Sequence, residues 1–383
     1  MIKLLIVDDS ALMRRQLTAL FKAEGDFEIR QAHNGAEAVA QNREFAPDVV
    51  TLDINMPEMD GITALSLIMA ERPVPVVMVS SLTEKGALAT LEALNLGAVD
   101  YVAKPGGTIS LSIHEIEADL VAKVRAAAGA RLGQVRPRTR SARRPADDDA
   151  SDTRPRSASA TRGLGLRLRT ERQRQATALA QQARQGSDNL LLIGVSTGGP
   201  RALEDLLPAL PADFPWPVLV AQHMPASFTG PFAQRLNTVC PLEVQEVTAP
   251  TPISSGHIYI ARGAADMVLT RRGGALTALP KPASAAHLWH PSVDVLGHSA
   301  LQHVKARNLV AVLLTGMGDD GAEAFAQIHQ GGGRTIAESQ ESAVVFGMPA
   351  ALIQRGGASV VLPLDRIAEQ INAWADAPRT TRT

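Results

Sequence analysis

The first 125 residues alternate between short apolar runs and stretches with apolar residues at helical spacing. Such alternation predicts an α/β domain whose parallel strands form one doubly wound sheet with right-handed crossovers. The five runs predicted as buried strands cover 2–7, 28–32, 48–52, 74–79 and 98–103. The helices predicted between and after them cover 11–23, 35–43, 62–70, 82–94 and 112–128.

The same kind of pattern returns in the C-terminal half. Three uninterrupted apolar runs predict strands that are buried on both faces of a mainly parallel sheet. These runs cover 189–195, 217–221 and 308–314, and a helical pattern follows each. We therefore expect a first domain over 1–125, a second α/β domain over 188–375 and a disordered tail over 376–383.

The segment between the two domains, 126–187, has a different composition. Residues 131–174 carry 13 Arg, no Lys and five acids, and they include no aromatic residue. A segment of this kind cannot bury a core, so the linker is predicted to be largely disordered. Residues 1–125 carry 11 basic and 18 acidic side chains, so attraction between linker and first domain is one hypothesis. RNA or membrane binding is the alternative, which the lack of interleaved aromatics disfavours.

The overall composition excludes several classes of protein. A formal net charge of −1 by itself indicates neither nucleic acid nor a membrane as partner. The single cysteine, Cys240, excludes an internal disulfide framework and fits a reducing compartment; we expect it to have a packing role. No apolar run approaches the roughly 18 residues of a membrane span, and the first run is too short for a signal peptide. We expect a cytoplasmic protein with no membrane-inserted segment.

Carboxylates follow two predicted strands of the first domain. Asp8 and Asp9 end the first strand and Asp53 ends the third, and these ends meet at the switch point of a doubly wound sheet. Three carboxylates at one point repel one another unless a cation joins them, and oxygen ligands favour Mg²⁺. Ser80 and Lys104 follow the fourth and fifth strands, where a hydroxyl and a cation suit a phosphorylated aspartate. Taken singly, each would be read as a solvated loop residue.

These residues closely resemble the response-regulator receiver family, whose fold is flavodoxin-like. The matching motifs are Val7-Asp8-Asp9-Ser10, Leu52-Asp53-Ile54-Asn55-Met56-Pro57, Val79-Ser80-Ser81 and Tyr101-Val102-Ala103-Lys104-Pro105. The resemblance implies that Asp53 accepts a phosphoryl group. It also implies that Asp8, Asp9, Asp53 and the carbonyl of Asn55 hold Mg²⁺, that Ser80 and Lys104 contact the phosphoryl group, and that Tyr101 changes position on activation.

The second domain places three reactive side chains after predicted strands. Ser196 lies in Gly194-Val195-Ser196-Thr197-Gly198, which matches the nucleophile-elbow pattern, although a phosphate loop or a tight turn has the same form. His223 follows the second strand and Asp320 the third. A serine, a base and an orienting carboxylate at one sheet edge would perform acyl transfer. Backbone N–H groups of the glycine turns, such as that of Met317, are candidates for binding the oxyanion. The alternatives are a structural histidine and a helix-capping aspartate.

These residues resemble the catalytic domain of the chemotaxis protein-glutamate methylesterase family (CheB) from about 188 to 375. The matching motifs are Ile193-Gly194-Val195-Ser196-Thr197-Gly198-Gly199-Pro200, Gln222-His223-Met224-Pro225, His290-Pro291-Ser292-Val293-Asp294 and Leu314-Thr315-Gly316-Met317-Gly318-Asp319-Asp320-Gly321. The resemblance implies Ser196 as nucleophile, His223 as base and Asp320 as the carboxylate, with Thr197 and Met317 assisting at the oxyanion site. Asp319 aligns with a variable position. The chain departs from the family pattern at Gly297, where an aromatic residue is usual, and in its long arginine-rich linker.

The resemblance implies hydrolysis of glutamate methyl esters, and deamidation of glutamines, on the methyl-accepting chemoreceptors that are its substrates. It implies a chemotaxis histidine kinase as phosphodonor, Mg²⁺ in the receiver and no cofactor for the esterase reaction. We hypothesise that the unphosphorylated receiver covers the catalytic site. The protein would contact receptor arrays peripherally and would not bind nucleic acid. Two rivals remain open: a non-enzymatic regulator with a partner-binding output domain, and a serine esterase for small molecules.

Overall fold

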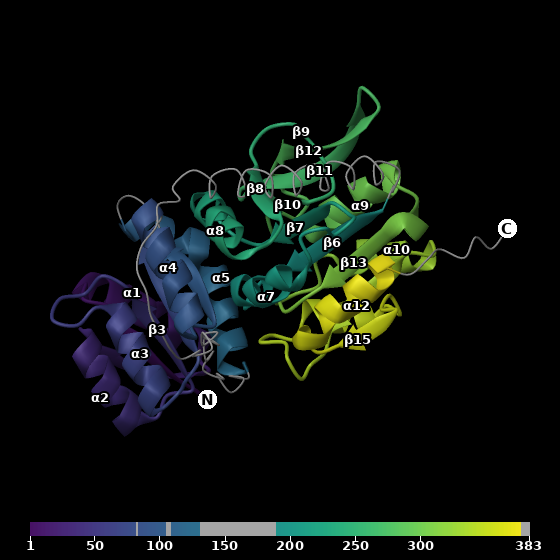
Figure 1. Ribbon diagram of the computed structural model, residues 1–383. Helices are drawn as coiled ribbons and strands as arrows, with labels where there is room; N and C mark the ends of the chain where they lie inside the picture. Colours follow the sequence, from purple (N-terminus) through teal and green to yellow (C-terminus); the bar gives the residue numbers. More distant parts are fainter. Residues whose placement is uncertain (82, 105–108, 131–188, 377–383) are drawn as a thin grey trace, which may run out of the picture. The chain divides into compact units, whose positions relative to one another are not determined.

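The computed structural model describes residues 1–81, 83–104, 109–130 and 189–376 (Figure 1). The predicted linker over 126–187 and tail over 376–383 lie outside these ranges, apart from 126–130 and 376, and Pro105 of the receiver motif lies outside them too. The predicted domain boundaries stay predictions.

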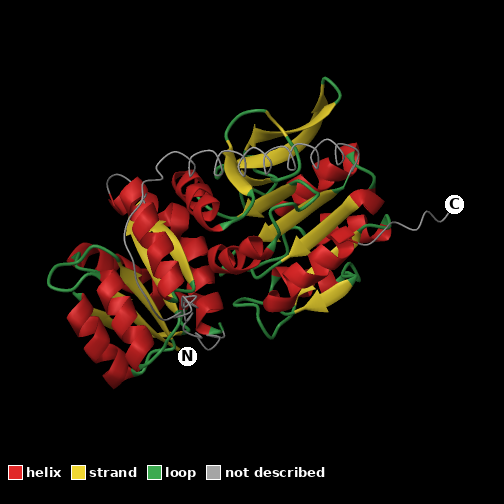
Figure 2. Ribbon diagram, in the orientation of Figure 1, coloured by secondary structure: helices red, strands yellow, loops and turns green. Residues whose placement is uncertain are grey.

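The N-terminal half is one parallel sheet with the strand order β2-β1-β3-β4-β5 and helices on both faces (Figure 2). Its strands are β1 (Ile2–Val7), β2 (Phe27–Ala32), β3 (Val49–Asp53), β4 (Val76–Ser81) and β5 (Asp100–Lys104). Its helices are α1 (Ala11–Glu24), α2 (Gly35–Phe45), α3 (Gly61–Glu71), α4 (Glu84–Leu96) and α5 (Ile109–Ala128). The predicted five-stranded doubly wound fold is confirmed. Because β1 lies between β2 and β3, the carboxyl ends of β1 and β3 are adjacent, as expected.

Polar side chains fix where the receiver helices begin. Ser10 Oγ accepts a hydrogen bond from the backbone N–H of Met13, and Asp60 Oδ1 accepts one from Thr63. Each cap satisfies a backbone donor of the first helical turn that has no partner within the helix. The first helix therefore starts three residues after Asp8, which holds the β1–α1 loop short and keeps its carboxylates at the sheet edge.

The C-terminal half contains a seven-stranded parallel sheet in the order β15-β14-β13-β6-β7-β10-β8 and a three-stranded antiparallel sheet in the order β11-β12-β9. The strands are β6 (Leu190–Val195), β7 (Val218–Gln222), β8 (Glu243–Val247), β9 (Thr251–Pro252), β10 (His257–Ala261), β11 (Ala265–Arg272), β12 (Ala275–Pro282), β13 (Leu309–Leu313), β14 (Arg334–Glu338) and β15 (Val360–Leu362). The helices are α7 (Gly199–Leu206), α8 (Ala226–Val239), α9 (Val293–His303), α10 (Ala322–Gln330), α11 (Met348–Gln354) and α12 (Leu364–Asp376), with single 3₁₀ turns η1 (Leu207–Ala209) and η2 (Ala306–Asn308).

The three apolar runs that predicted buried strands occupy the centre of the large sheet. β13, β6 and β7 are consecutive in the strand order, and every residue of all three is buried. Side chains alternate between the two faces of a strand, so Leu191 and Ile193 join the core on one face, and Leu190 and Leu192 join the core on the other. The mainly parallel sheet expected from the sequence is confirmed.

The hairpin of β11 and β12 is the main element that the apolar pattern did not predict. Its turn is formed by Gly273 and Gly274, both with positive φ (57° and 86°), as a tight hairpin turn requires. The inner side chains Met267, Leu269 and Ala278 pack in the same core as Leu296 of α9. The hairpin is therefore anchored on α9.

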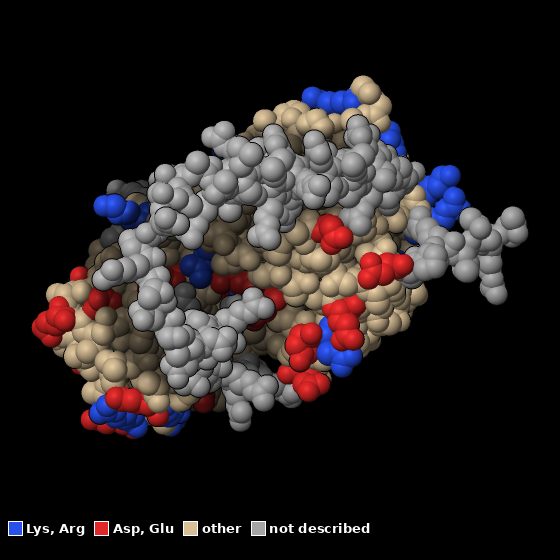
Figure 3. All heavy atoms as spheres, viewed as in Figure 1, with Lys and Arg blue, Asp and Glu red and all other residues tan. Residues whose placement is uncertain are grey.

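Charged side chains of both signs are interspersed on the face shown in Figure 3, over surface that is mostly neither acidic nor basic. Within the described ranges, no helix combines the length and apolarity needed to cross a bilayer.

Candidate active site

Ser196 lies in the turn between β6 and α7, where the sequence predicts it. Its backbone N–H donates to the carbonyl of Thr315, beyond the end of β13, which fixes the turn against the neighbouring strand. Gly198 has φ of 79°, a conformation that glycine adopts without strain, and an added Cβ there would lie 2.8 Å from Val344. The turn therefore holds the serine at the carboxyl edge of the sheet, with 8% of its surface exposed.

His223 follows the last residue of β7 and reaches the serine across one strand spacing. Its Nδ1 lies 3.0 Å from Ser196 Oγ, and its Nε2 lies 2.8 Å from Oδ2 of Asp320. Its backbone N–H donates to the carbonyl of Val195, which ties the two strand ends together. The predicted serine, histidine and aspartate therefore form one continuous hydrogen-bonded chain, in which a proton leaving the serine has an acceptor in contact.

Several hydrogen-bond donors at the start of α9 hold the side chain of Asp320. Its Oδ1 accepts hydrogen bonds from Ser292 Oγ (2.9 Å) and the backbone N–H of Asp294 (3.0 Å), and its Oδ2 accepts one from the N–H of Val293 (2.7 Å). Burial by itself would raise the pKa of Asp320, but the hydrogen bond and charge of His223 and these N–H groups outweigh it and hold the pKa below its ordinary value. The carboxylate therefore stays ionised beside the imidazole.

The neighbouring acid, Asp319, points elsewhere. Its side chain is 68% exposed and forms an ion pair with Arg355 at 3.0 Å. Of the two adjacent aspartates in the glycine turn, Asp320 is the one that meets the histidine, as the resemblance implied.

One predicted oxyanion residue is next to the serine in the sequence, and the other lies in a turn that packs against the serine. Thr197 follows it directly, and the Thr197 hydroxyl donates to Oδ2 of Asp100 at 2.6 Å. Met317 lies in the turn after β13. An added Cβ on Gly316, the residue before Met317, would lie 2.7 Å from the Cβ of Ser196, so this turn packs directly against the serine. The backbone N–H groups of both turns are therefore candidates for binding an oxyanion.

Three residues of the site received no role from the sequence. The indole of Trp289 stacks on the His223 ring at 5.5 Å between centroids and 11° between planes. Gln222 Nε2 donates to the carbonyls of Ser196 (3.1 Å) and His223 (3.0 Å), which binds the two catalytic turns to each other. The third is Ser292, which orients the carboxylate. Trp289 and Ser292 come before a helix and not after a strand, so the strand-end pattern could not find them, although Ser292 carries the usual signal of a helix cap.

The receiver carries the predicted acidic site at the carboxyl ends of β1 and β3. Oxygen atoms of Asp8, Asp9 and Asp53 lie within 4.8 Å of one another. Lys104 Nζ lies 2.9 Å from both Asp8 Oδ2 and Asp53 Oδ2. Asn55 lies exposed in the β3–α3 loop, two residues beyond Asp53. Such a set of oxygen donors around one point is of the kind that holds a hard divalent cation.

Burial and charge shift the pKa values of this site. Burial raises the pKa of Asp53, aided by the charge of Asp8, and Lys104 only partly offsets it. Burial lowers the pKa of Lys104, but the carboxylates of Asp53 and Asp8 outweigh it, so the net pKa of Lys104 is raised. Lys104 therefore stays charged as the counterion of the acidic site.

The other two residues predicted to respond to phosphorylation, Ser80 and Tyr101, lie on β4 and β5. Ser80, at the end of β4, is buried and its hydroxyl donates to the carbonyl of Gly86 at 3.3 Å. Tyr101 on β5 is buried, and its ring stacks on that of Phe228 of α8, with 4.6 Å between centroids and 18° between planes. The Tyr101 ring therefore contacts the C-terminal half of the chain.

Comparisons with known proteins agree with both halves. The CheB methylesterase family model matches residues 191–371, and the response regulator receiver domain model matches residues 4–113. The protein-glutamate methylesterase/protein-glutamine glutaminase 3 of Rhodospirillum rubrum is 52% identical over 382 residues, which cover 100% of this chain and 98% of that protein. The corresponding protein 2 of Rhodopseudomonas palustris is 52% identical over 98% of this chain and 99% of its own length.

The solved structures that resemble this chain each cover only its N-terminal or its C-terminal half. The catalytic domain of Thermotoga maritima CheB methylesterase is 37% identical and covers 49% of this chain and 98% of its own, with a TM-score of 0.47. Identity of 52% over the full length of curated relatives is the stronger finding. The chain belongs to the protein-glutamate methylesterase/protein-glutamine glutaminase family, as its motifs predicted.

Proposed function

We propose that this protein hydrolyses glutamate methyl esters on chemoreceptors, and deamidates receptor glutamines, under the control of phosphorylation. The observation that carries the proposal is the hydrogen-bonded chain of three side chains. Ser196 Oγ lies 3.0 Å from His223 Nδ1, and His223 Nε2 lies 2.8 Å from Asp320 Oδ2. The relatives of this chain are named for these two reactions. A non-enzymatic output domain would need no such chain of three side chains, so that alternative is not favoured.

The first half of the reaction forms an acyl-enzyme. Ser196 Oγ attacks the γ-carbonyl carbon while His223 Nδ1 takes the hydroxyl proton, and the tetrahedral intermediate carries a negative oxygen. The backbone N–H groups of the Thr197 and Met317 turns are the proposed donors for that oxygen. His223 then gives its proton to the leaving group, which departs as methanol from an ester or ammonia from an amide.

The second half regenerates the serine. His223 takes a proton from water, the resulting hydroxide attacks the acyl carbon, and Ser196 leaves with the proton returned by His223. Asp320 never needs to accept a proton. Its two oxygens already receive bonds from Ser292 and backbone N–H groups of α9, so it stabilises the imidazolium as a fixed negative charge.

The receiver site fits phosphorylation at Asp53. Asp8, Asp9 and Asp53, with the carbonyl of Asn55, are the residues that would hold Mg²⁺, which supplies charge neutralisation for the incoming phosphoryl group when it is bound. Lys104 and Ser80 are then the cation and hydroxyl that contact the phosphoryl oxygens. A chemotaxis histidine kinase is the proposed phosphodonor, and the proposed location of the protein is the cytoplasmic side of receptor arrays.

Two contacts support restraint of the catalytic site by the unphosphorylated receiver. Asp100 of β5 accepts the hydroxyl hydrogen bond of Thr197, the residue next to the nucleophile. Tyr101, the adjacent residue, stacks on Phe228. Because phosphorylation adds charge near β5, it would bias these contacts and shift the population toward an accessible site.

A methanol-release assay tests the proposal. Receptor membranes with methylated glutamates are incubated with the full chain, with and without a small phosphodonor for Asp53. We expect methanol release that rises with phosphorylation and that disappears in Ser196→Ala, whose fold is checked by circular dichroism. Normal release by Ser196→Ala, or hydrolysis of a small ester but never of methylated receptor, would contradict the proposal.

A further inference from the structure

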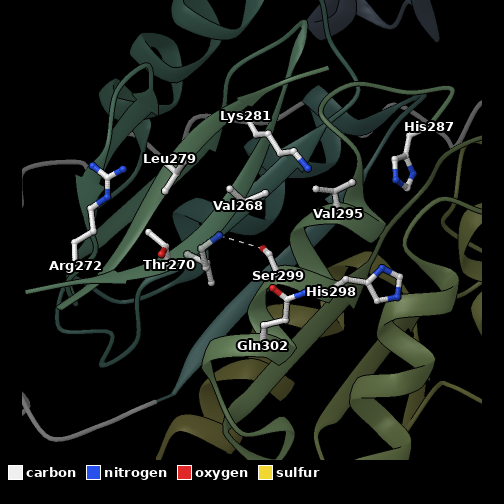
Figure 4. Close-up of a pocket in the computed structure, with 11 residues that line it drawn as sticks. Val268, Thr270, Arg272, Leu279, Lys281, His287, Val295, His298, Ser299 and Gln302 are labelled. Atoms are coloured by element: carbon white, nitrogen blue, oxygen red, sulfur yellow. Dashed lines mark hydrogen bonds between the residues drawn. The ribbon is translucent and has the colours of Figure 1, made fainter. Parts of the chain in front are cut away.

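A cavity of about 510 Å³ lies between α9 and the β11–β12 hairpin (Figure 4). Its apolar lining includes Val268, Leu279 and Val295. Basic and imidazole side chains from four segments also line it: Arg272 of β11, Lys281 of β12, His287 of the loop before α9 and His298 of α9. In Figure 4, Lys281, His287 and His298 lie around one common space, and none of the described residues that line it is acidic. The cavity is therefore electropositive, and part of its lining is apolar.

The nearby carboxylates are already engaged. Asp266, which is paired with Lys281 in the β11–β12 ladder, is buried and accepts hydrogen bonds from His290 Nδ1 and the N–H of Ser292, both at 2.8 Å. Asp294 accepts from the N–H of Ala324 at 2.8 Å. Among the residues that the structure describes, neither Lys281 nor Arg272 has an acidic partner within ion-pair distance. The positive charge of the cavity is consequently open to an outside anion.

Two short stretches of chain connect the cavity to the catalytic site. His287 lines the cavity, Leu288 is the next residue and is 87% exposed, and Trp289 after it stacks on His223. The same helix joins the two sites: the N–H of Val293 binds Asp320, and His298, five residues on, lines the cavity. Five residues of helix span about 7.5 Å. A chain that lies across Leu288 can therefore reach both sites at once.

We propose that this cavity binds a carboxylate of the protein substrate, on a residue near the one being hydrolysed. The inference rests on the proposed function, since the substrate is then a protein segment that displays glutamates. Each turnover converts an ester into a carboxylate, so a segment with more than one modified position becomes more anionic as it is processed. Arg272 and Lys281 attract that charge, and Leu288 supplies the apolar contact between the two sites.

The test uses the full chain and binding rather than catalysis, so it does not depend on esterase activity. The probe is a fluorescein-labelled alanine-based helical peptide of about 20 residues, long enough to form a helix, with four glutamates, compared with the same peptide carrying glutamines. We expect Arg272→Gln/Lys281→Gln to weaken binding of the glutamate peptide by about 5- to 20-fold, as two exposed ion pairs would. Lys305→Gln, an exposed cation of the same domain outside the cavity, should leave binding unchanged.

Kinetics separate this proposal from the proposed function. With methylated receptor, the double variant should show a raised KM with an unchanged kcat, and hydrolysis of a small glutamate methyl ester should be unaffected. Equal affinity of wild type and double variant for the glutamate peptide overturns the cavity assignment, even where methanol release is normal. A further outcome would overturn the cavity assignment in favour of a membrane surface. In that outcome the wild type binds phosphatidylserine vesicles but not the peptide, and the double variant no longer binds the vesicles. Failure of methanol release with intact peptide discrimination contradicts the proposed function alone.

Discussion

Ser292 Oγ donates a hydrogen bond of 2.9 Å to Oδ1 of Asp320, the carboxylate whose other oxygen faces His223. Ser292 is fully buried and also accepts a hydrogen bond from the N–H of Val295, which caps α9. One hydroxyl therefore fixes both the start of the helix and the orientation of the carboxylate. The geometry of the imidazole depends in this way on a helix terminus and not only on the three strand ends.

Replacing this serine tests that dependence. In Ser292→Ala we expect kcat to fall about 5- to 10-fold on both receptor and a small ester, because the carboxylate loses one of its fixed donors, and stability to fall by about 1–3 kcal/mol. Steady-state kinetics and thermal unfolding measure the two effects. Ser299→Ala is the matched control: Ser299 lies further along α9, and its hydroxyl accepts a hydrogen bond from the N–H of Leu269 of β11 and not from any group at Asp320. If both variants lowered kcat on the small ester equally, Ser292 would have only a structural role.

The two adjacent aspartates of the glycine turn give a second test. Asp320→Asn should lower kcat by about 10⁴-fold, since an amide neither stabilises the imidazolium nor holds the required tautomer. The kcat of Asp319→Asn should stay within about twofold of the wild-type value. Asp319 is exposed and pairs with Arg355 at the surface, where ion pairs contribute little. Comparable losses in the two variants would show that the assignment of the orienting carboxylate is wrong.

The lowered pKa of Asp320 makes a prediction about stability and pH. A carboxyl whose pKa is lower in the folded than in the unfolded protein contributes stability above its ordinary pKa, and this contribution disappears as the pH falls through the folded value. The melting temperature of the wild type should therefore exceed that of Asp320→Asn at pH 6–7, and the difference should shrink below about pH 4. Thermal unfolding from pH 3 to 7 measures it. A difference that stayed constant with pH would show that ionisation of Asp320 does not contribute.

The sequence predicted what depends on local pattern. Ser196, His223 and Asp53 each follow an apolar strand, so the sheet edge that collects them could be inferred from periodicity and the geometry of parallel strands. The short strands at the sides of the large sheet were not predicted, because segments such as β8, Glu243–Val247, are partly exposed and alternate instead of forming an apolar run. The turn Gly273-Gly274 is a hairpin signal that periodicity alone does not use.

Contacts between distant segments could not be predicted from pattern. Trp289 meets His223 from a loop with no regular spacing, and the hydroxyl of Thr197 finds its acceptor on Asp100, 97 positions away. Nothing in the local sequence of either partner specifies the other. Family resemblance named Thr197 for the oxyanion site, but the structure also gives its side chain a partner in the receiver.

Removing the negative charge of Asp53 from the acidic site of the receiver should raise the stability of the folded protein. Asp53 has a raised pKa, so folding disfavours its ionised form at neutral pH, and this penalty disappears once the pH is low enough to protonate the group in both states. Asp53→Asn should therefore melt at a higher temperature than the wild type at pH 7, with a smaller gain at pH 4. Addition of Mg²⁺ should raise the melting temperature of the wild type and much less that of the variant. Glu44→Gln, an exposed receiver acid, is the control. A variant less stable than the wild type at pH 7 would contradict the burial argument.

The hydrogen bond between Thr197 and Asp100 predicts how the receiver restrains the esterase. Asp100→Ala removes the acceptor without altering the catalytic residues, so the unphosphorylated protein should release methanol about tenfold faster, the factor that about 1.4 kcal/mol from a charged hydrogen bond provides. On the proposal that phosphorylation releases this contact, the rate of the phosphorylated protein should change little, and the ratio of activated to basal rate should fall. Asp119→Ala, which removes a different carboxylate beside Lys123, is the control. An unchanged basal rate in Asp100→Ala would mean that the bond forms without restraining the site.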